Sequence, residues 1–152
     1  MAYYSRKSAR IPHYDYVSYN YYFVTICTHN RRCIFGSVGE LSPVGQIAKE
    51  EILEISTHYS GVSVDHYVVM PNHIHMILVL QENAQNLNVV VGQYKSGVSR
   101  RAHKLRPELS VWQRSYHDHI IRNQTSYEKI WNYIEGNPSK WMEDCFYIDT
   151  SL

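Results

Sequence analysis

The spacing of apolar and polar residues changes its period along the chain and predicts a mixture of strands and helices. Short runs rich in aromatic and β-branched residues, such as Tyr21–Cys27, have the composition of strands. Longer stretches repeat apolar residues every three or four positions, which is typical of one buried helix face. In chain order the pattern predicts a strand at 21–27, a helix at 43–59, strands at 62–70 and 73–80, a helix at 90–105, a strand at 110–116 continuing through 122, and a helix at 125–136.

Local signals indicate where the predicted helices begin and end. Ser42-Pro43 has the form of an N-cap followed by proline at the first helical position. Thr125 and Glu128, three residues apart, have the form of a capping box. The residue before a proline is disfavoured in α conformation, so in Asn137-Pro138 we expect the asparagine to cap a short final helix instead.

The order of the elements, β-α-β-β-α-β-α, predicts an α+β fold of ferredoxin-like type, with helices packed on an antiparallel sheet. The strands at 62–70 and 73–80 are separated only by Pro71-Asn72, so they must be antiparallel neighbours. A chain of 152 residues is long enough for one domain with its own core. We therefore expect residues 1–152 to form a single domain.

Composition excludes several protein classes. No apolar run approaches the roughly 20 residues that span a bilayer. The N-terminus lacks the apolar core of a secretory signal, so we expect a cytoplasmic protein that does not bind membranes. Three dispersed cysteines argue against a disulfide framework or a cysteine-ligated zinc. Residues 1–20, with Arg6, Lys7 and Arg10, form a basic N-terminal arm that is either poorly ordered or laid along a ligand.

The net charge of +1 conceals a basic segment between Gln93 and Arg122. Seven basic residues stand there against two acidic ones. This surplus fits a phosphate-rich partner, and fourteen tyrosines offer flat faces for unpaired bases. A solvated helix face is the commoner meaning of such a run. The candidates for DNA contacts are Lys95, Arg100, Arg101, Lys104, Arg114 and Arg122.

His73 and His75 lie two residues apart on a predicted strand that is otherwise apolar. In extended conformation both imidazoles project from one face, while Ile74, Met76 and Leu78 project from the other. Two adjacent imidazoles can chelate a divalent metal, and a buried ring nitrogen without a partner would cost roughly 1–3 kcal/mol. The alternative is that His73 only marks the start of the strand and His75 faces solvent.

A metal held by two histidines keeps most of its coordination sphere open, which suits a catalytic site. Such an ion can polarise a phosphodiester oxygen and neutralise charge that develops during attack. Serine, cysteine, water or a tyrosine on a helix beside the sheet are all candidate nucleophiles, the last forming a phosphotyrosine ester. On the final predicted helix Tyr133 and Asn137 are one turn apart and can face the same point.

Several motifs together resemble the HUH single-tyrosine transposases, in particular their REP-associated branch. Met70–His75 resembles the HUH motif, and Tyr133–Pro138 is similar to the Y-I-x-x-N-P segment of that branch. Further stretches that resemble the family, in its order and spacing, are Tyr22–Thr25, Lys95, Val111–Arg114 and Asp118–Arg122. The resemblance covers most of the chain.

The resemblance implies a DNA strand transferase dependent on Mg²⁺ or Mn²⁺. His73 and His75 would be metal ligands, and Asn137 a third, where the insertion-sequence branch has a longer glutamine. Tyr133 would attack the scissile phosphate of single-stranded, hairpin-forming DNA, giving a 5′-phosphotyrosine and a free 3′-hydroxyl, with rejoining by the reverse step. His119 would support the site as a ligand or a DNA contact; a structural role is its alternative.

Two other function classes stay open. One is a non-catalytic module that binds single-stranded nucleic acid on the same scaffold, and the other is a metal-dependent phosphodiesterase that uses water. We expect a homodimer, because the short chain has little tail to fill its own cleft, although the REP-associated branch can act as a monomer.

Overall fold

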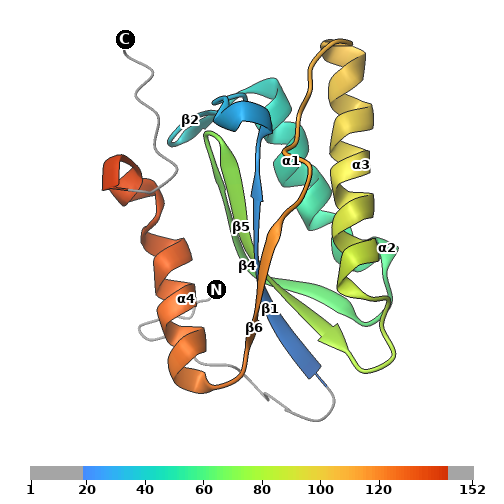
Figure 1. Cartoon of the computed structure of the whole chain (residues 1–152), viewed down its shortest axis with the longest axis vertical. Helices are drawn as coiled ribbons and strands as arrows, with labels where there is room; N and C mark the ends of the chain where they lie inside the picture. The colour runs from blue at the N-terminus through green and yellow to red at the C-terminus, as the bar shows by residue number, and fades with distance from the viewer. Residues whose placement is uncertain (1–18, 144–152) are drawn as a thin grey trace.

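The computed structural model describes residues 19–143, which form a four-stranded antiparallel sheet with helices on both faces (Figure 1). Most of the predicted N-terminal arm lies outside the described residues. No helix within 19–143 is long and apolar enough to cross a membrane. The elements are β1 (Tyr19–Cys27), the 3₁₀ turn η1 (His29–Arg31), β2 (Gly36–Ser37), β3 (Glu40–Leu41), α1 (Pro43–Leu53), α2 (Ile55–His58), β4 (Val62–Met70), β5 (His73–Gln81), α3 (Leu87–Leu105), β6 (His117–Ile121), α4 (Gln124–Gly136) and the 3₁₀ helix η2 (Pro138–Glu143).

The strands of the sheet lie in the order β4-β5-β1-β6, and every neighbouring pair is antiparallel. β4 and β5 are joined by the two residues Pro71-Asn72, as predicted. The helices α1 and α2 carry the chain from β1 to β4, and β5 then returns between these two strands. The predicted α+β fold of ferredoxin-like type is confirmed, with a small β2-β3 hairpin added before α1.

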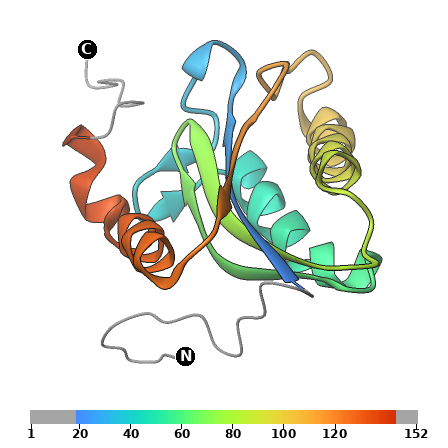
Figure 2. The same ribbon diagram turned by 60° about the horizontal axis from the view of Figure 1, so that its bottom comes forward.

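Helices α1 and α3 cover one face of the sheet, and α4 lies on the other (Figures 1 and 2). Alternate residues of each strand serve these two layers, since successive side chains of a strand point to opposite faces. On β1, Val24 and Ile26 pack in the cluster under α1 and α3, while Tyr21 packs with α4. The sheet is therefore the middle layer of three.

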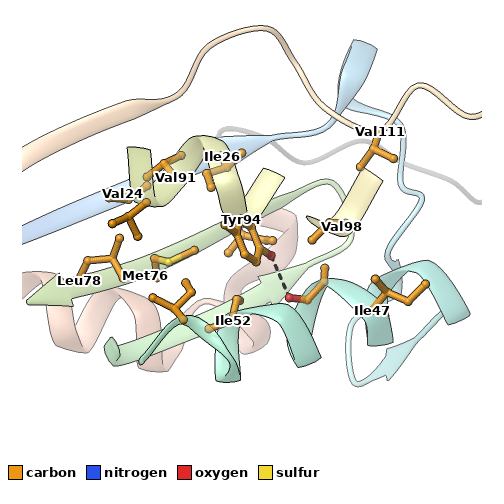
Figure 3. Packing of buried hydrophobic residues seen from close by; sticks show 14 of the residues in the cluster. Val24, Ile26, Ile47, Ile52, Met76, Leu78, Val91, Tyr94, Val98 and Val111 are labelled. Atoms are coloured by element: carbon orange, nitrogen blue, oxygen red, sulfur yellow. Dashed lines mark hydrogen bonds between the residues drawn. The ribbon is translucent and has the colours of Figure 1, made fainter. Parts of the chain in front are cut away.

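The larger cluster lies between the sheet and α1 and α3 (Figure 3). Val24, Met76 and Leu78 of the sheet meet Ile52 of α1 there, and all four are buried. Burial of such a side chain contributes roughly 1.5–3 kcal/mol. Tyr94 of α3 is buried with them and donates a hydrogen bond of 2.9 Å from its hydroxyl to the carbonyl of Ala48 (Figure 3).

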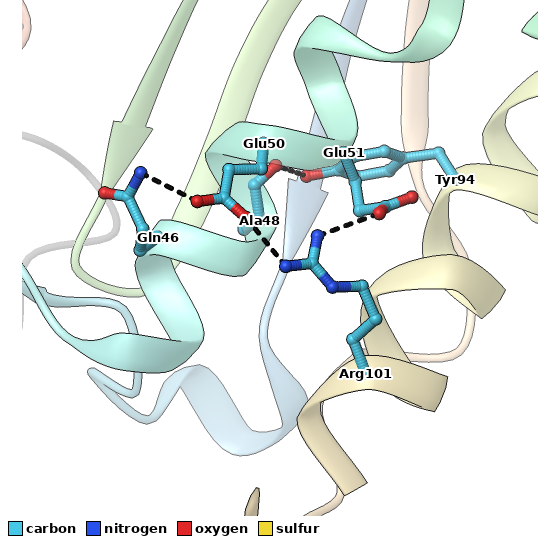
Figure 4. Close-up of polar contacts among 6 residues, drawn as sticks. All are labelled: Gln46, Ala48, Glu50, Glu51, Tyr94 and Arg101. Carbon is cyan, nitrogen blue, oxygen red and sulfur yellow. Dashed lines mark hydrogen bonds and ion pairs between the residues drawn. The ribbon is translucent and has the colours of Figure 1, made fainter. Parts of the chain in front are cut away.

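Arg101 joins α3 to α1 at the edge of this core (Figure 4). Its two terminal nitrogens donate to Glu50 Oε1 over 2.7 Å and to Glu51 Oε2 over 3.0 Å. The hydrogen bond from Arg101 is the main cause that lowers the pKa of Glu50, followed by one from Gln46. The guanidinium is therefore committed to neighbouring carboxylates.

The structure confirms one predicted helix cap and corrects another. Ser42 caps α1, because its Oγ accepts a hydrogen bond of 3.0 Å from the amide of Gly45. The predicted capping box at Thr125 is wrong, since α4 begins earlier, at Gln124. Its cap is Asn123, whose Oδ1 accepts from the amide of Ser126 over 2.8 Å. Asparagine is among the best N-cap residues, so a helix that starts at Gln124 has its unpaired first-turn amide satisfied at least as well as one capped by Thr125.

The end of α4 also differs from the expectation. Asn137 has φ −56° and ψ −46°, so it is helical despite preceding Pro138, and α4 continues directly into η2. Its side-chain amide donates to the carbonyl of Tyr133 over 3.1 Å, a local contact that accompanies this conformation. Asn137 therefore remains on the same helical turn as Tyr133.

Two other elements were predicted to be longer than they are in the structure. The segment 110–116 is not part of the last strand, which begins at His117; Trp112 only forms an isolated bridge with Thr28. The predicted helix at 43–59 is divided at Glu54 into α1 and α2. Periodicity does not register such breaks, because the apolar residues keep the same face on both sides of them.

We predict that Asn123→Ala lowers the free energy of unfolding by about 1 kcal/mol, since it removes the cap of α4. Thr125→Ala is the matched control, because this exposed threonine is already inside the helix, and its cost should be well under half as large. Urea unfolding of both variants measures the two values. A larger loss for Thr125→Ala would restore the capping box and contradict Asn123 as the cap.

Candidate active site

The face of the sheet that packs against α4 carries the two histidines of β5. His73 is 0% exposed and His75 2% exposed, and their ring centroids lie 4.6 Å apart. Ile74 and Met76 point into the core on the opposite face. The predicted pairing of the imidazoles on one face is therefore confirmed, and the alternative of a solvent-facing His75 is excluded.

Each imidazole is oriented by a hydrogen bond to its Nδ1 atom. Thr25, the cross-strand partner of His75 on β1, places Oγ1 2.9 Å from His75 Nδ1. His73 Nδ1 lies 2.8 Å from Oδ1 of Asn72, whose own amide nitrogen donates to the carbonyl of Arg31 over 3.2 Å. Because that Oδ1 can only accept, His73 Nδ1 donates, and Nε2 is the atom that the ring can offer to a metal.

His73 is held in its neutral form. Burial lowers its pKa from 6.5 to about 4, and the nearby positive charge of Arg31 adds to this effect. A histidine must be neutral to ligate a metal. The surroundings of His73 therefore keep it competent as a ligand throughout the range near neutral pH.

Tyr133 of α4 lies beside His75, the second histidine of the pair, within the same chain. The centroid of its ring is 5.2 Å from that of His75 and 6.3 Å from that of Phe23 on β1, edge-on to both. The residue is 44% exposed, although its ring touches these two residues of the sheet. Its ring is thus positioned by the sheet while the side chain stays accessible from solvent.

Asn137, one turn after Tyr133, is 3% exposed. Its Oδ1 is buried and accepts no hydrogen bond from residues 19–143. A buried amide oxygen of this kind fits a metal ligand. Within the described part of the chain no three His, Cys, Asp or Glu side chains gather to hold an ion, so a metal site here would need the amide oxygen beside the two imidazoles.

Three of the predicted basic contacts lie in the layer on the far side of the sheet. Arg100, Arg101 and Lys104 belong to α3, whereas the histidine pair faces α4. Arg101 is bonded to α1, as described above, and Arg100 lines a cavity of about 290 Å³ between α3 and α1. The structure therefore does not bring these three residues together with the histidines.

Lys95 and its neighbours shape the loop before β6. The ammonium group of Lys95 donates to the carbonyl of Gln113 over 2.9 Å and to that of Arg114 over 3.4 Å, and burial lowers the pKa of Lys95. The indole of Trp112 donates to the carbonyl of Lys95 over 3.0 Å. Arg114 and Arg122, on either side of β6, are exposed. The lysine thus holds the loop that carries Arg114.

His119 of β6 is exposed and pairs with Phe23 of β1, so it shares the face of Phe23 and Tyr133. His117 is the cross-strand partner of Thr25, in the same row as His75. The structure therefore aligns His117 with His75 and places His119 one row away.

Sequence reasoning missed the residues that surround the imidazoles. Thr25 and Asn72 orient the rings, and Trp141 of η2 stacks beside His73 with ring centroids 6.2 Å apart at 29°. The only available signal was the two-residue spacing of Tyr21, Phe23 and Thr25 on β1, which puts these three side chains on one face of the strand. The pairing register that brings Thr25 to His75 is not visible in the sequence.

Comparisons with known proteins identify the family of the chain. The sequence model of the family described as "Transposase IS200 like" matches residues 16–137. An uncharacterized protein of Haemophilus influenzae is 34% identical over 169 aligned positions, covering 95% of this chain and 94% of that protein. A second H. influenzae protein, named "Putative REP-associated tyrosine transposase", is 28% identical over 82 residues, or 47% of each chain.

Two solved structures share the fold. A REP-associated tyrosine transposase bound to a REP hairpin has a TM-score of 0.66 at 23% identity, covering 92% of this chain and 74% of that one. A protein of Deinococcus radiodurans R1 described as a "putative transposase" has a TM-score of 0.58 at 21% identity, covering 86% of this chain and 97% of its own. Since the family match extends over most of the sequence, the chain belongs to the family of IS200-like transposases.

Proposed function

We propose that this chain is a metal-dependent strand transferase that cleaves and rejoins single-stranded, hairpin-forming DNA through a 5′-phosphotyrosine at Tyr133. The observation that carries the proposal is the 5.2 Å between the ring centroids of Tyr133 and His75. A nucleophile must lie close to the group that activates the phosphate. Among the tyrosines of residues 19–143, Tyr133 combines this proximity with exposure to a substrate.

In the proposed cleavage, Tyr133 Oη bonds to phosphorus and the bond between phosphorus and the 3′ oxygen breaks. The phenol loses its proton as the new bond forms, and the departing 3′ oxygen gains one. The 5′ phosphate stays on the tyrosine as an ester, so the energy of the phosphodiester is conserved. In rejoining, a 3′-hydroxyl attacks this ester and restores the phenol.

The donors that would hold Mg²⁺ or Mn²⁺ are His73 Nε2, His75 Nε2 and Asn137 Oδ1. A bound ion would supply polarisation of the scissile phosphate and neutralisation of its developing charge. Two imidazoles and one amide leave coordination positions open for phosphate oxygens and water. Thr25 and Asn72 keep the rings in the required orientation through their hydrogen bonds to Nδ1.

The partner we propose is a DNA hairpin with a single-stranded flank. The likeness to a protein bound to a REP hairpin supports this substrate class for the present chain. We assign backbone contacts first to Arg114 and Arg122, which are exposed on either side of β6, and a supporting contact to His119 on the face of Tyr133. Arg100, Arg101 and Lys104 would touch only DNA that wraps around to α3. The cytoplasm, where chromosomal DNA is available, is the compartment we propose.

The position of Tyr133 favours action within one chain. The expected homodimer would be required for chemistry only if the tyrosine came from a partner, and here the phenol reaches His75 of its own subunit. We therefore propose cleavage in cis.

We predict that the protein, incubated with a labelled hairpin oligonucleotide and Mn²⁺, forms a covalent adduct that survives denaturing electrophoresis. Tyr133→Phe should abolish the adduct, since phenylalanine cannot form the ester, and EDTA should do the same to the wild type. Tyr59→Phe, at the end of α2, is the matched control and should leave the adduct intact.

Two results would contradict the proposal and indicate the alternatives. Hairpin binding without an adduct in any divalent metal would favour a non-catalytic binding module. Cleavage that persists in Tyr133→Phe would favour a phosphodiesterase that uses water.

We predict that His73 makes the metal-free protein less stable in acid. Its pKa is about 4 when folded and 6.5 when unfolded, so between these values the unfolded chain binds more protons. The contribution of neutral His73 to the free energy of unfolding is retained above pH 6.5 and is lost as the pH falls toward 4. Between pH 7 and pH 5 this loss amounts to about 2 kcal/mol. In the presence of EDTA, urea unfolding of His73→Gln should lack this share of the pH dependence. Parallel stability curves for the variant and the wild type would show that His73 is not the source.

A further inference from the structure

The edge strand β4 contains a β-bulge at the point where it passes α4. Val64 pairs with Leu78 of β5 and His66 pairs with Ile77, so Asp65 is an extra residue in the ladder. A bulge of this kind re-aims the side chains that follow it. Its effect here can be read from the faces that the residues of β4 occupy.

The bulge turns His66 toward α4. In a regular strand alternate residues share a face, so His66 would join Val62 and Val64, which pack in the cluster under α1 and α3. After the extra residue the alternation is inverted, and Val68 packs in the cluster on the α4 side. Asp65 and His66, although adjacent, can therefore both reach α4.

Both residues contact α4 directly. Tyr127 donates its hydroxyl hydrogen to Asp65 Oδ2 over 2.5 Å. His66 Nε2 lies 3.1 Å from Glu135 Oε1, and its ring stacks on Trp131 with centroids 4.4 Å apart at 19°. The three partners span just over two turns of α4. They lie on either side of Tyr133 along the helix.

Two of these contacts, at Trp131 and Glu135, lie on the opposite flank of the helix from Tyr133, and the third, at Tyr127, lies between the flanks. Tyr133 and Glu135 are two residues apart and thus separated by about 200° around the axis. The buried residues Tyr127 and Ile134 lie between the two flanks and face the sheet. An apolar stripe tolerates some rolling of a helix, whereas the stacked ring and the close His66–Glu135 contact on one flank, with the hydrogen bond of Tyr127 to Asp65, oppose it.

A small roll of α4 is enough to displace the nucleophile. The phenol oxygen of a helical tyrosine lies about 8 Å from the helix axis, so a rotation of 10° moves it by about 1.4 Å. A misplacement of about 1 Å can cost 100-fold in rate. Contacts that limit such a roll therefore matter for the rate even if they contribute little to stability.

We propose that Asp65 and His66, presented by the bulge in β4, are positioning residues that set the rotation of α4 and so hold Tyr133 against His75. This inference rests on the proposed function, because it assigns these residues a role in the attack by Tyr133. Neither side chain needs to touch the DNA. Their partners Tyr127, Trp131 and Glu135 form the other half of the contact.

The test compares the rate of adduct formation at saturating hairpin DNA with the affinity for the same DNA. His66→Ala should lower the rate about tenfold or more while the dissociation constant changes by less than about threefold, since positioning affects the transition state and not binding. Glu135→Ala, at a position exposed enough to be tolerated, should lower the rate by a smaller factor. Glu135→Gln keeps an acceptor for His66 and should recover most of the rate. Asn132→Ala, exposed on α4, is the control and should match the wild type.

A second measurement does not depend on activity. Nuclear Overhauser contacts between the rings of Tyr133 and His75 should be present in the wild type and in Glu135→Gln, and weakened in His66→Ala and Glu135→Ala while α4 remains helical. Unchanged ring contacts together with an unchanged rate would overturn the positioning role. A wild type that forms no adduct would overturn the proposed function alone, and the ring contacts would then decide the positioning role by themselves.

Discussion

The two-residue repeat of strand β5 is the constraint on which the remaining structure depends. Ile74, Met76 and Leu78 enter the main core, and His73 and His75 therefore stand on the opposite face. A slip of one residue would expose the aliphatic side chains and turn the imidazoles into the core, at a cost of several kcal/mol. Core packing thus fixes the position of the histidines, although the histidines contribute nothing to that packing.

The two faces of the sheet are covered to different degrees, and the candidate chemistry belongs to the thinner one. Two helices and a large cluster cover the far face, whereas α4 packs through the small cluster of Tyr21, Ile77, Val79, Ile121, Tyr127 and Ile134. A helix held by few apolar contacts depends more on polar ones for its exact orientation. The contacts of α4 with the bulge in β4 and with the imidazoles therefore gain importance.

The polar groups beneath α4 form an ordered set and not a collection of isolated buried groups. Thr25 and Asn72 each occupy one imidazole nitrogen, and burial with Arg31 nearby keeps His73 neutral. Solved relatives at 21% and 23% identity retain this fold, which indicates that the packed sheet tolerates wide changes in sequence. Within such a scaffold, function depends on a few side chains at fixed register positions.

The sequence alone determined the main order of strands and helices and the shared face of His73 and His75, because each follows from a local period of the backbone. It also located Ser42 as a cap but not Asn123, since Asn123 and Thr125 are both good cap residues two positions apart and the local pattern does not decide between them. Only the tertiary structure decided that Thr25 meets His75, that Lys95 and Arg101 are committed to neighbours, and that a bulge turns His66 toward α4. These features depend on strand register and on contacts between residues distant along the chain, which no local pattern of apolar and polar residues specifies.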